Sequence, residues 1–168
     1  MLFAPSYEER RRHLPGDALL PDAAGIVMHG ITIDAPPALV WPWLVQMGSG
    51  RAGWYSYDWV DNDGHRSAKD IVPSLQTIAP GGLMPSLPGA TDSFIVAAVE
   101  ANRDLILTVP AKGAGLLVTW EFFLEPRAAH RNACWCAVAL HLDGPGVAPA
   151  TTPRLRCVLS NVFTQSWR

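Results

Sequence analysis

The stretch from Ile31 to Trp59, ITIDAPPALVWPWLVQMGSGRAGWYSYDW, constrains the fold of this chain more than any other part of the sequence. Apolar residues that alternate up to Ile33 predict a strand, because successive side chains of a strand point to opposite faces. Asp34 then offers a carboxylate that can accept a hydrogen bond from the first turn of a helix. Pro36 and Pro37 suit the first helical positions, where no intrahelical donor is needed. The stretch therefore predicts a strand followed directly by a helix.

The helix is expected to present one apolar stripe and to end at Gly48. The stripe has the i, i+3, i+4, i+7 spacing of residues that share a helix face, and it comprises Val40, Trp43, Leu44 and Met47. Pro42 lies inside this pattern and has no backbone N–H to donate, so the helix should be kinked or shortened there. Gly48 stands where a left-handed residue is wanted to end a helix.

A loop rich in aromatic residues follows the helix. Trp54, Tyr55, Tyr57 and Trp59 lie within six residues. A loop rarely carries so much aromatic surface unless it folds over something apolar. One interpretation is that the loop fills the core of its own domain, and the other is that it walls a cavity for a small ligand. Both can hold for different residues of the loop.

Four segments of the chain resemble the START-like superfamily, also called SRPBCC or helix-grip, and within it the bacterial proteins labelled polyketide cyclase/dehydrase-like. These segments are LPGDALLPD (14–22), the stretch 31–59, IVAAVEANRDLIL (95–107) and TWEFFLEP (119–126). The resemblance implies an α+β fold in which a curved antiparallel β-sheet packs on a C-terminal helix, with a cavity for an apolar ligand between them. The resemblance covers roughly residues 14–126. A length of 168 residues suits a single START-like domain over 1–168, and Pro5, Pro15 and Pro21 indicate an extended N-terminal arm within 1–25. The C-terminal helix is expected within 153–168, where it would be shorter than is usual for the superfamily.

Alternating residues predict further strands in the second half of the chain. Segments 94–100 and 105–109 indicate a hairpin, and 118–125 and 133–142 indicate two more strands. Short turns between consecutive strands imply antiparallel pairing. On the strand 118–125, alternation places Trp120 and Phe122 on one face and Glu121 on the other, where it is expected to meet solvent. In the last strand small alanines share a face with Trp135, a pattern typical of a concave face that leaves room for a ligand or a helix.

These patterns define the candidate site residues. The ligand-binding candidates are Trp43, Met47, Arg51, Trp54, Tyr55, Trp59, Trp120, Phe122 and Trp135. The catalytic candidates are Asp58, Tyr57 and His65, because a carboxylate buried in an apolar pocket has a raised pKa that suits proton transfer. Simpler roles are open for each of them: Asp58 can cap a helix that begins at Trp59, Arg51 can pair with Asp58, and His65 can be a surface residue.

Composition excludes several classes of function. The net charge of −2 argues against nucleic acid as a partner. No run of residues approaches the ~20 apolar residues that a membrane span needs. The odd number of cysteines, 3, fits a reducing compartment, so a cytoplasmic location is expected. Cys134 and Cys136 lack a further ligand at a familiar spacing, so neither a metal site nor a cofactor is expected.

Three functions remain open from the sequence. The first is the binding of a small apolar or aromatic molecule in a cavity between the sheet and the helices. The second is an enzyme of the cyclase, dehydratase or isomerase type that uses an acid/base residue in that cavity. The third is a protein-interaction module without a ligand. A short C-terminal helix would leave part of the sheet uncovered, and a homodimer is one way to cover it.

Overall fold

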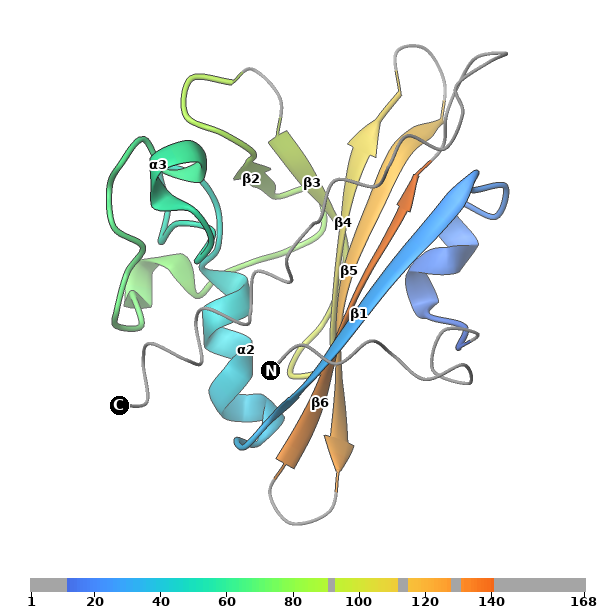
Figure 1. The fold of residues 1–168 in the computed structure, drawn as a ribbon, viewed down its shortest axis with the longest axis horizontal. Coiled ribbons are helices and arrows are strands. Elements are labelled where there is room, and N and C mark those ends of the chain that lie inside the picture. The colour runs from blue at the N-terminus through green and yellow to red at the C-terminus, as the bar shows by residue number, and fades with distance from the viewer. Residues whose placement is uncertain (1–11, 91–92, 112–114, 128–130, 141–168) are drawn as a thin grey trace.

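The computed structural model describes residues 12–90, 93–111, 115–127 and 131–140, and it describes β6 by its backbone. Strands and short helices alternate irregularly along this part of the chain (Figure 1). The elements are η1 (Pro15–Leu19), β1 (Gly25–Ile33), α2 (Pro37–Val45), α3 (Asp58–Asp61), η2 (Pro73–Leu75), β2 (Leu83–Pro85), β3 (Ser93–Glu100), β4 (Asp104–Pro110), β5 (Leu116–Arg127) and β6 (Arg131–Leu140).

The strands form one six-stranded antiparallel sheet in the order β1-β6-β5-β4-β3-β2 (Figure 1). Four of the five pairings join strands that are consecutive in the sequence, as short hairpin connections require. The fifth pairing joins β1 to β6, with Gly25 aligned to Leu140 and Ile33 to Asn132. The expected curved antiparallel sheet of an α+β, helix-grip-like fold is thus confirmed. The expected C-terminal helix within 153–168 lies outside the described residues.

The predicted strands of the second half are all present. The hairpin of β3 and β4 turns at Asn102, which has a positive φ of 62°. The short strand β2 was not expected, because the segment around it is rich in proline and glycine and favours a turn. β2 pairs with the beginning of β3 and buries Met84, which is 1% exposed.

Helix α2 differs from its expected form in three ways. Its N-cap is Pro36 rather than Asp34, and no side chain caps it. It ends at Val45, before Gly48, although Pro42 is accommodated inside it. The residue that joins Val40 and Leu44 in the core is Trp41, at 9% exposure, whereas Trp43 is only half-buried. Successive residues are about 100° apart around a helix. The buried face of α2 is therefore rotated from the predicted stripe, so that Trp41 rather than Trp43 points toward the sheet.

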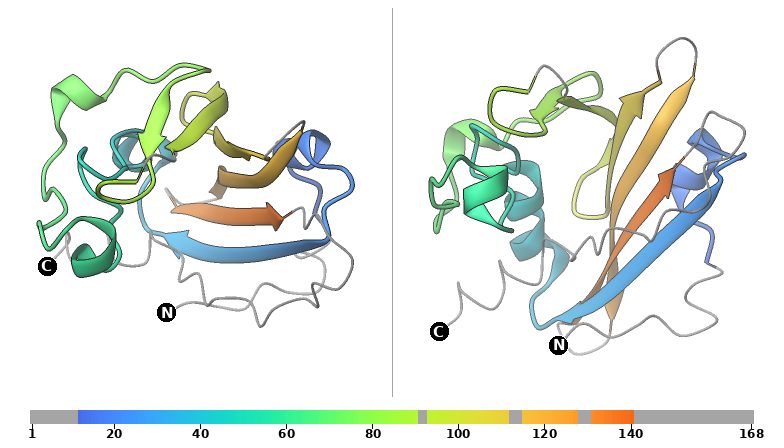
Figure 2. Two further views of the ribbon diagram at one scale, coloured as in Figure 1. Left: turned by 90° about the horizontal axis from the view of Figure 1, so that it is seen from above. Right: turned by 45° about the horizontal axis from the view of Figure 1, so that its top comes forward.

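The two faces of the sheet are covered by different parts of the chain. Helix α2 and the loop that follows it cover one face, called the inner face here, while η1 lies against the other, called the outer face (Figure 2). The inner face carries the main hydrophobic core, in which Leu44, Leu105, Phe122 and Leu124 are fully buried.

The outer face is covered by the described part of the N-terminal arm. Leu14 and Leu20, on either side of η1, are 4% and 8% exposed. Glu121 lies beneath this segment and is only 2% exposed, so the expectation that it meets solvent is wrong. The alternation of β5 was interpreted correctly, but the sequence pattern did not indicate that this face would be covered.

Candidate functional site

Four aromatic rings from three separate segments meet on the inner face. Trp54 stacks on Trp120 with ring centroids 5.3 Å apart and an interplanar angle of 26°. Phe94 contacts both indoles at 5.5 and 5.1 Å, and Phe122 lies 4.9 Å from Trp120. The indole nitrogen of Trp54 donates to the carbonyl of Ser86 at 2.7 Å, which fixes the loop to the segment after β2. We call these four residues the aromatic cluster.

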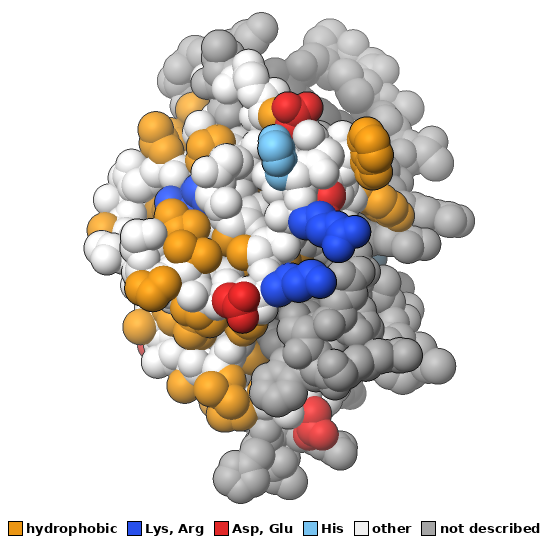
Figure 3. Space-filling model, turned by 90° about the vertical axis from the view of Figure 1, so that its left-hand side faces the viewer, with side chains coloured by type: hydrophobic (Ala, Val, Ile, Leu, Met, Phe, Trp, Pro, Cys, Tyr) orange, Lys and Arg blue, Asp and Glu red, His pale blue; other side chains and the backbone are white. Residues whose placement is uncertain are grey.

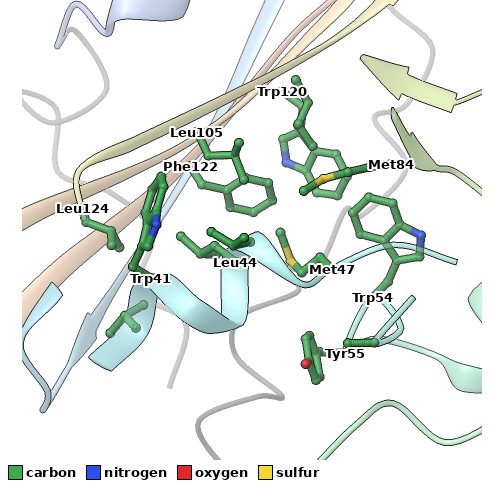
Figure 4. Close-up of a cluster of buried hydrophobic side chains, with 14 of the residues drawn as sticks. Trp41, Leu44, Met47, Trp54, Tyr55, Met84, Leu105, Trp120, Phe122 and Leu124 are labelled. Carbon is green, nitrogen blue, oxygen red and sulfur yellow. The ribbon is translucent and has the colours of Figure 1, made fainter. Parts of the chain in front are cut away.

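Sulfur-containing and aliphatic side chains surround the aromatic cluster. Met84 from β2 lies beside Trp120 and Trp54, and Met47 lies between Trp54 and helix α2 (Figure 4). Trp41 closes the opposite end of the core next to Leu124 (Figure 4). Methionine adapts its shape to irregular aromatic surfaces, and both methionines are buried here, at 0% and 1% exposure.

Burial on the inner face falls from one end of the sheet to the other. Leu105, Phe122 and Leu124 have 0% exposure where the sheet meets α2. The register aligns Val109 with Val118 farther along β4 and β5, and both are half-buried. Phe94 on β3 and Val27 on β1, toward the same end, are also half-buried. The aromatic cluster lies at the boundary between the closed and the more open end.

His29 is a polar residue on the inner face. The register aligns it with Cys136 of β6, which is aligned in turn with Phe122 of β5. Residues directly opposite each other on paired strands share a face, so His29 belongs to the same row as Phe122. It is half-buried. In the sequence His29 stands out only as part of the alternation in β1, and nothing there places it near a site.

A buried glutamine joins the helix to the loop. Gln46 has 0% exposure and donates to the hydroxyl of Tyr55 and to the carbonyl of Asp70, the latter at 3.2 Å. Its oxygen accepts from the backbone of Val72 at 2.9 Å and from Gln76 at 3.2 Å. Burial raises the pKa of the Tyr55 hydroxyl, so Tyr55 is a neutral hydrogen-bonding group here. Its ring meets Trp43 edge-on at 5.9 Å.

Arg51 caps the end of helix α2. Its guanidinium donates to the carbonyls of Met47 at 2.9 Å, Val45 at 3.1 Å and Leu75 at 3.4 Å. Burial lowers the pKa of Arg51, and these carbonyls accept hydrogen bonds from its Nε and Nη2. Carbonyls at a helix C-terminus need such partners because no further turn supplies them. The expected pairing of Arg51 with Asp58 is therefore not formed.

The three catalytic candidates lie apart from the aromatic cluster. Tyr57 is 57% exposed, and His65 is exposed as well. Asp58 accepts hydrogen bonds from the Ser67 hydroxyl at 2.6 Å and the Ser67 amide at 3.1 Å, which tie α3 to the chain that follows it. The helix cap expected of Asp58 is also absent, since the N-cap residue is Tyr57.

Trp59 projects from α3 and is 89% exposed, so the aromatic loop divides into a buried and an exposed half. Figure 3 views the molecule from the side of α3 and shows hydrophobic and charged side chains intermixed on that surface. The buried half, Trp54 and Tyr55, belongs to the core, as the simpler interpretation predicted.

The remaining candidate, Trp135, occupies a different row of the sheet. The register aligns position 135 with Phe123 of β5 and Gly30 of β1 rather than with Trp120 and Phe122. The fold thus brings together Met47, Trp54, Trp120 and Phe122, with Trp43, Arg51 and Tyr55 in the adjoining loop and helix. Phe94, Met84 and His29 were not identified from sequence, although the alternation of β1 and β3 carried the signal for two of them.

Comparison with known proteins finds similarity of structure alone. No family model matches the chain, and no curated protein matches it. The conserved protein of unknown function EF2215 from Enterococcus faecalis is similar to it, with a TM-score of 0.51 and 14% identity, over 88% of this chain and 78% of that one. At this identity the similarity concerns the fold.

Two further solved structures are more distant. CalU16 from Micromonospora echinospora has a TM-score of 0.43 and 16% identity, over 70% of this chain, which spans 62% of CalU16. The Aha1 dimer from Colwellia psychrerythraea has a TM-score of 0.44 and 13% identity, over 74% of this chain and 81% of that one. In the described part of the chain, no helix is both long and apolar enough to cross a membrane.

Proposed function

We propose that this protein binds a small apolar, partly aromatic molecule at the half-buried end of the inner face. The observation that carries the proposal is the fall in burial along that face, from Phe122 at 0% exposure to the half-buried Val118 and Val27. A ligand in this position would rest on the aromatic cluster and cover the valines of β1, β4 and β5. The resemblance of four segments to the START-like superfamily supports the same assignment.

The chemistry of the lining favours an aromatic or polycyclic ligand. Trp120 of β5 and the half-buried Phe94 of β3 present ring faces and edges on the same face of the sheet. Offset or edge-on contacts between aromatic rings contribute about 0.5–1.5 kcal/mol each beyond the burial of area. Methionines next to these rings adapt to ligands of different shape. His29 supplies one polar group in an otherwise apolar lining, and such a group orients a ligand rather than holding it.

Fluorescence can test the binding. Aminoanthracene, a small apolar aromatic probe, should quench tryptophan emission in a saturable way, and the measurement is made in a Trp59→Phe background to remove the exposed indole. Val118→Trp should abolish the saturable quenching by filling the half-buried end. Ile26→Trp is the matched control, because Ile26 is 53% exposed and lies in the same row of the sheet as Thr119, on the outer face. Equal quenching in both variants, or none in the parent, contradicts the proposal.

A cyclase, dehydratase or isomerase is the second candidate, and the position of His29 on the inner face favours it. Imidazole can take up and return a proton near neutral pH, which is what such reactions require. In this function His29 is the acid/base, in place of the loop residues Asp58, Tyr57 and His65. Chemical change of a ligand that competes with aminoanthracene, followed by mass spectrometry, distinguishes this enzyme from a binding protein. A protein-interaction module, displaying Trp59, remains if no small molecule competes.

A further inference from the structure

Two carboxyl groups are buried together on the outer face, on the far side of the sheet from the proposed ligand site. Asp104 begins β4 and Glu121 lies in β5, and their exposures are 5% and 2%. The residues paired with Glu121 across the sheet are Ile106 and Ala137. Neither of them can neutralise a charge, so the two carboxyl groups depend on each other and on the segment that covers them.

One shared proton accounts for the arrangement. Asp104 Oδ1 and Glu121 Oε1 are buried and accept no hydrogen bond from any donor in the described residues. Leaving both oxygens unpaired is costly, whereas a proton on one carboxyl lets it donate to the other. Two adjacent carboxylates also repel each other. Burial is the largest cause that raises the pKa of Glu121 to about 8 and that of Asp104 to about 6, and the charge of Asp104 raises the pKa of Glu121 further.

The N-terminal segment closes directly over this pair. The backbone amide of Gly16 donates to Glu121 Oε2 at 2.9 Å. A Cβ atom built on Gly16 would lie 2.5 Å from the same oxygen, so a larger residue at this position would displace the Glu121 carboxyl group. Leu14 and Leu20 are buried on either side of this contact. The segment therefore rests on Glu121, one carboxyl group of the pair.

The charged groups around the pair are already engaged with each other. Arg103 bonds Glu100 at 2.9 and 3.1 Å, and Arg12 bonds Glu125 at 2.8 Å. His13 Nδ1 lies 3.6 Å from Asp17 Oδ2. The titratable and charged groups that face the pair from its surroundings are thus Asp17 and His13 at η1, Arg12 before it, Glu100 and Arg103 at the β3–β4 turn, and Glu125 on β5.

We infer that residues 12–20 form a proton-dependent latch on the outer face, closed while Asp104 and Glu121 share a proton and opened when both are ionised. Opening uncovers Leu14, Leu20 and the outer-face side chain of Ile106, which is 3% exposed in the closed state. The latch is independent of the proposed ligand site, because it lies on the other face of the sheet.

The direction of the pH dependence follows from proton counting. In the open state Glu121 is hydrated and has an ordinary carboxyl pKa, so over the interval below pH 8 the closed state holds a proton that the open state has lost. For the Glu121 proton, closure should therefore weaken by up to about ten-fold per pH unit as the pH rises from about 4.5, the ordinary carboxyl pKa, to about 8, and then level off.

Hydrogen–deuterium exchange of the intact protein tests the latch. After correction for intrinsic exchange rates, protection of amides 14–20 should fall with rising pH, while that of β4 should stay constant. Glu121→Gln should remove the pH dependence and keep the latch closed, because an amide can donate to Asp104 and still accept from Gly16. Asp63→Asn, at an exposed carboxylate that does not contribute to the pKa shifts of the pair, is the control and should retain the dependence of the parent.

Two results would overturn the latch. One is protection of amides 14–20 that does not change between about pH 6 and about pH 8 in the parent protein. The other is the same pH dependence in the parent and in Glu121→Gln. If Glu121→Gln fails to fold, infrared spectroscopy of the parent decides: the carbonyl band of a protonated carboxylic acid must disappear over the pH range in which protection is lost. Absence of that band at about pH 6 contradicts the shared proton.

Discussion

Trp120 and Trp59 have the same side chain in opposite environments. Trp120 is 7% exposed and contacts three other rings of the aromatic cluster. Trp59 is 89% exposed, and its position on α3 is maintained by hydrogen bonds of other residues, such as that between Asp58 and Ser67. An indole in the core contributes through burial and ring contacts, whereas one in water contributes little to folding.

Replacing the two tryptophans by alanine should therefore have very different effects on the free energy of unfolding. Trp120→Ala should lower it by about 3–5 kcal/mol, through lost burial and a residual cavity. Trp59→Ala should change it by less than about 0.5 kcal/mol. Urea denaturation followed by circular dichroism measures both. Similar losses in the two variants would show that Trp59 is buried in solution.

The sequence identified the aromatic residues but did not show which of those in the loop are buried and which are exposed. Trp120 of β5 was assigned to the correct face because a strand alternates its side chains. The loop 48–59 has no periodicity, so nothing in it distinguished Trp54, which turns inward, from Trp59, which does not. Glu121 was assigned to the correct face, yet its burial depends on η1, which is more than a hundred residues away in the sequence.

Among the elements, the loop between α2 and α3 is shaped by glycines in left-handed conformations. Gly53 has a φ of +84°, pairs with Gly48 in an isolated bridge and packs against Ser67. A Cβ atom at Gly53 would lie 2.3 Å from Ser67 Oγ and 3.0 Å from its Cα. Ser67 in turn bonds the amide of Tyr55 and the carboxylate of Asp58. Ser67 therefore connects both halves of the aromatic loop, and the absence of a side chain at Gly53 leaves room for it.

Gly53→Ala should destabilise the protein more than Gly81→Ala, although both glycines have nearly the same φ. Gly81 has a φ of +86°, and no atom lies within 4 Å of the position that its Cβ would occupy, so alanine there should cost about 1 kcal/mol of backbone strain. Gly53→Ala should cost about 2–4 kcal/mol, since Ser67 must also move. Urea denaturation compares the two, and equal costs would contradict the close packing on Ser67.

Helix α2 illustrates why an element is easier to predict than its orientation. Its existence followed from the apolar spacing and the prolines at its start. Its inward face did not, because Trp41 and Trp43 are two residues apart and both are apolar. The contacts of α2 with β5 determine which face of the helix turns inward, and the burial of Trp41 identifies that face. Gln46 was overlooked because a buried amide has no sequence signature.

At the scale of the whole molecule, the buried carboxyl pair predicts how stability depends on pH. The pKa of Glu121 is raised to about 8 and that of Asp104 to about 6 by burial, so the folded state holds protons that the unfolded chain releases at lower pH. The free energy of unfolding should fall as the pH rises from the ordinary carboxyl pKa values to about 8, by at most about 1.4 kcal/mol per pH unit for each proton, and level off above about pH 8.

Urea midpoints at about pH 5, about pH 7 and about pH 8.5 test this trend, and they should decrease in that order. Glu121→Gln should flatten the upper part of the profile. A midpoint that increases with pH over the same range would show that ion pairs elsewhere outweigh the carboxyl pair. The antiparallel sheet could be predicted from alternation and from the resemblance of four segments. This pH dependence could not be predicted, because it arises from contacts between η1, β4 and β5, which are far apart in the sequence.

The pairing of β1 with β6 has a consequence for how the chain is made. Gly25 is aligned with Leu140, so among the described strands the first to be synthesised waits for the last before the two can pair. Contacts of such long sequence separation slow folding. During translation β1 is an unpaired edge next to an apolar helix, which is the kind of segment that chaperones recognise and that aggregates when synthesis stalls.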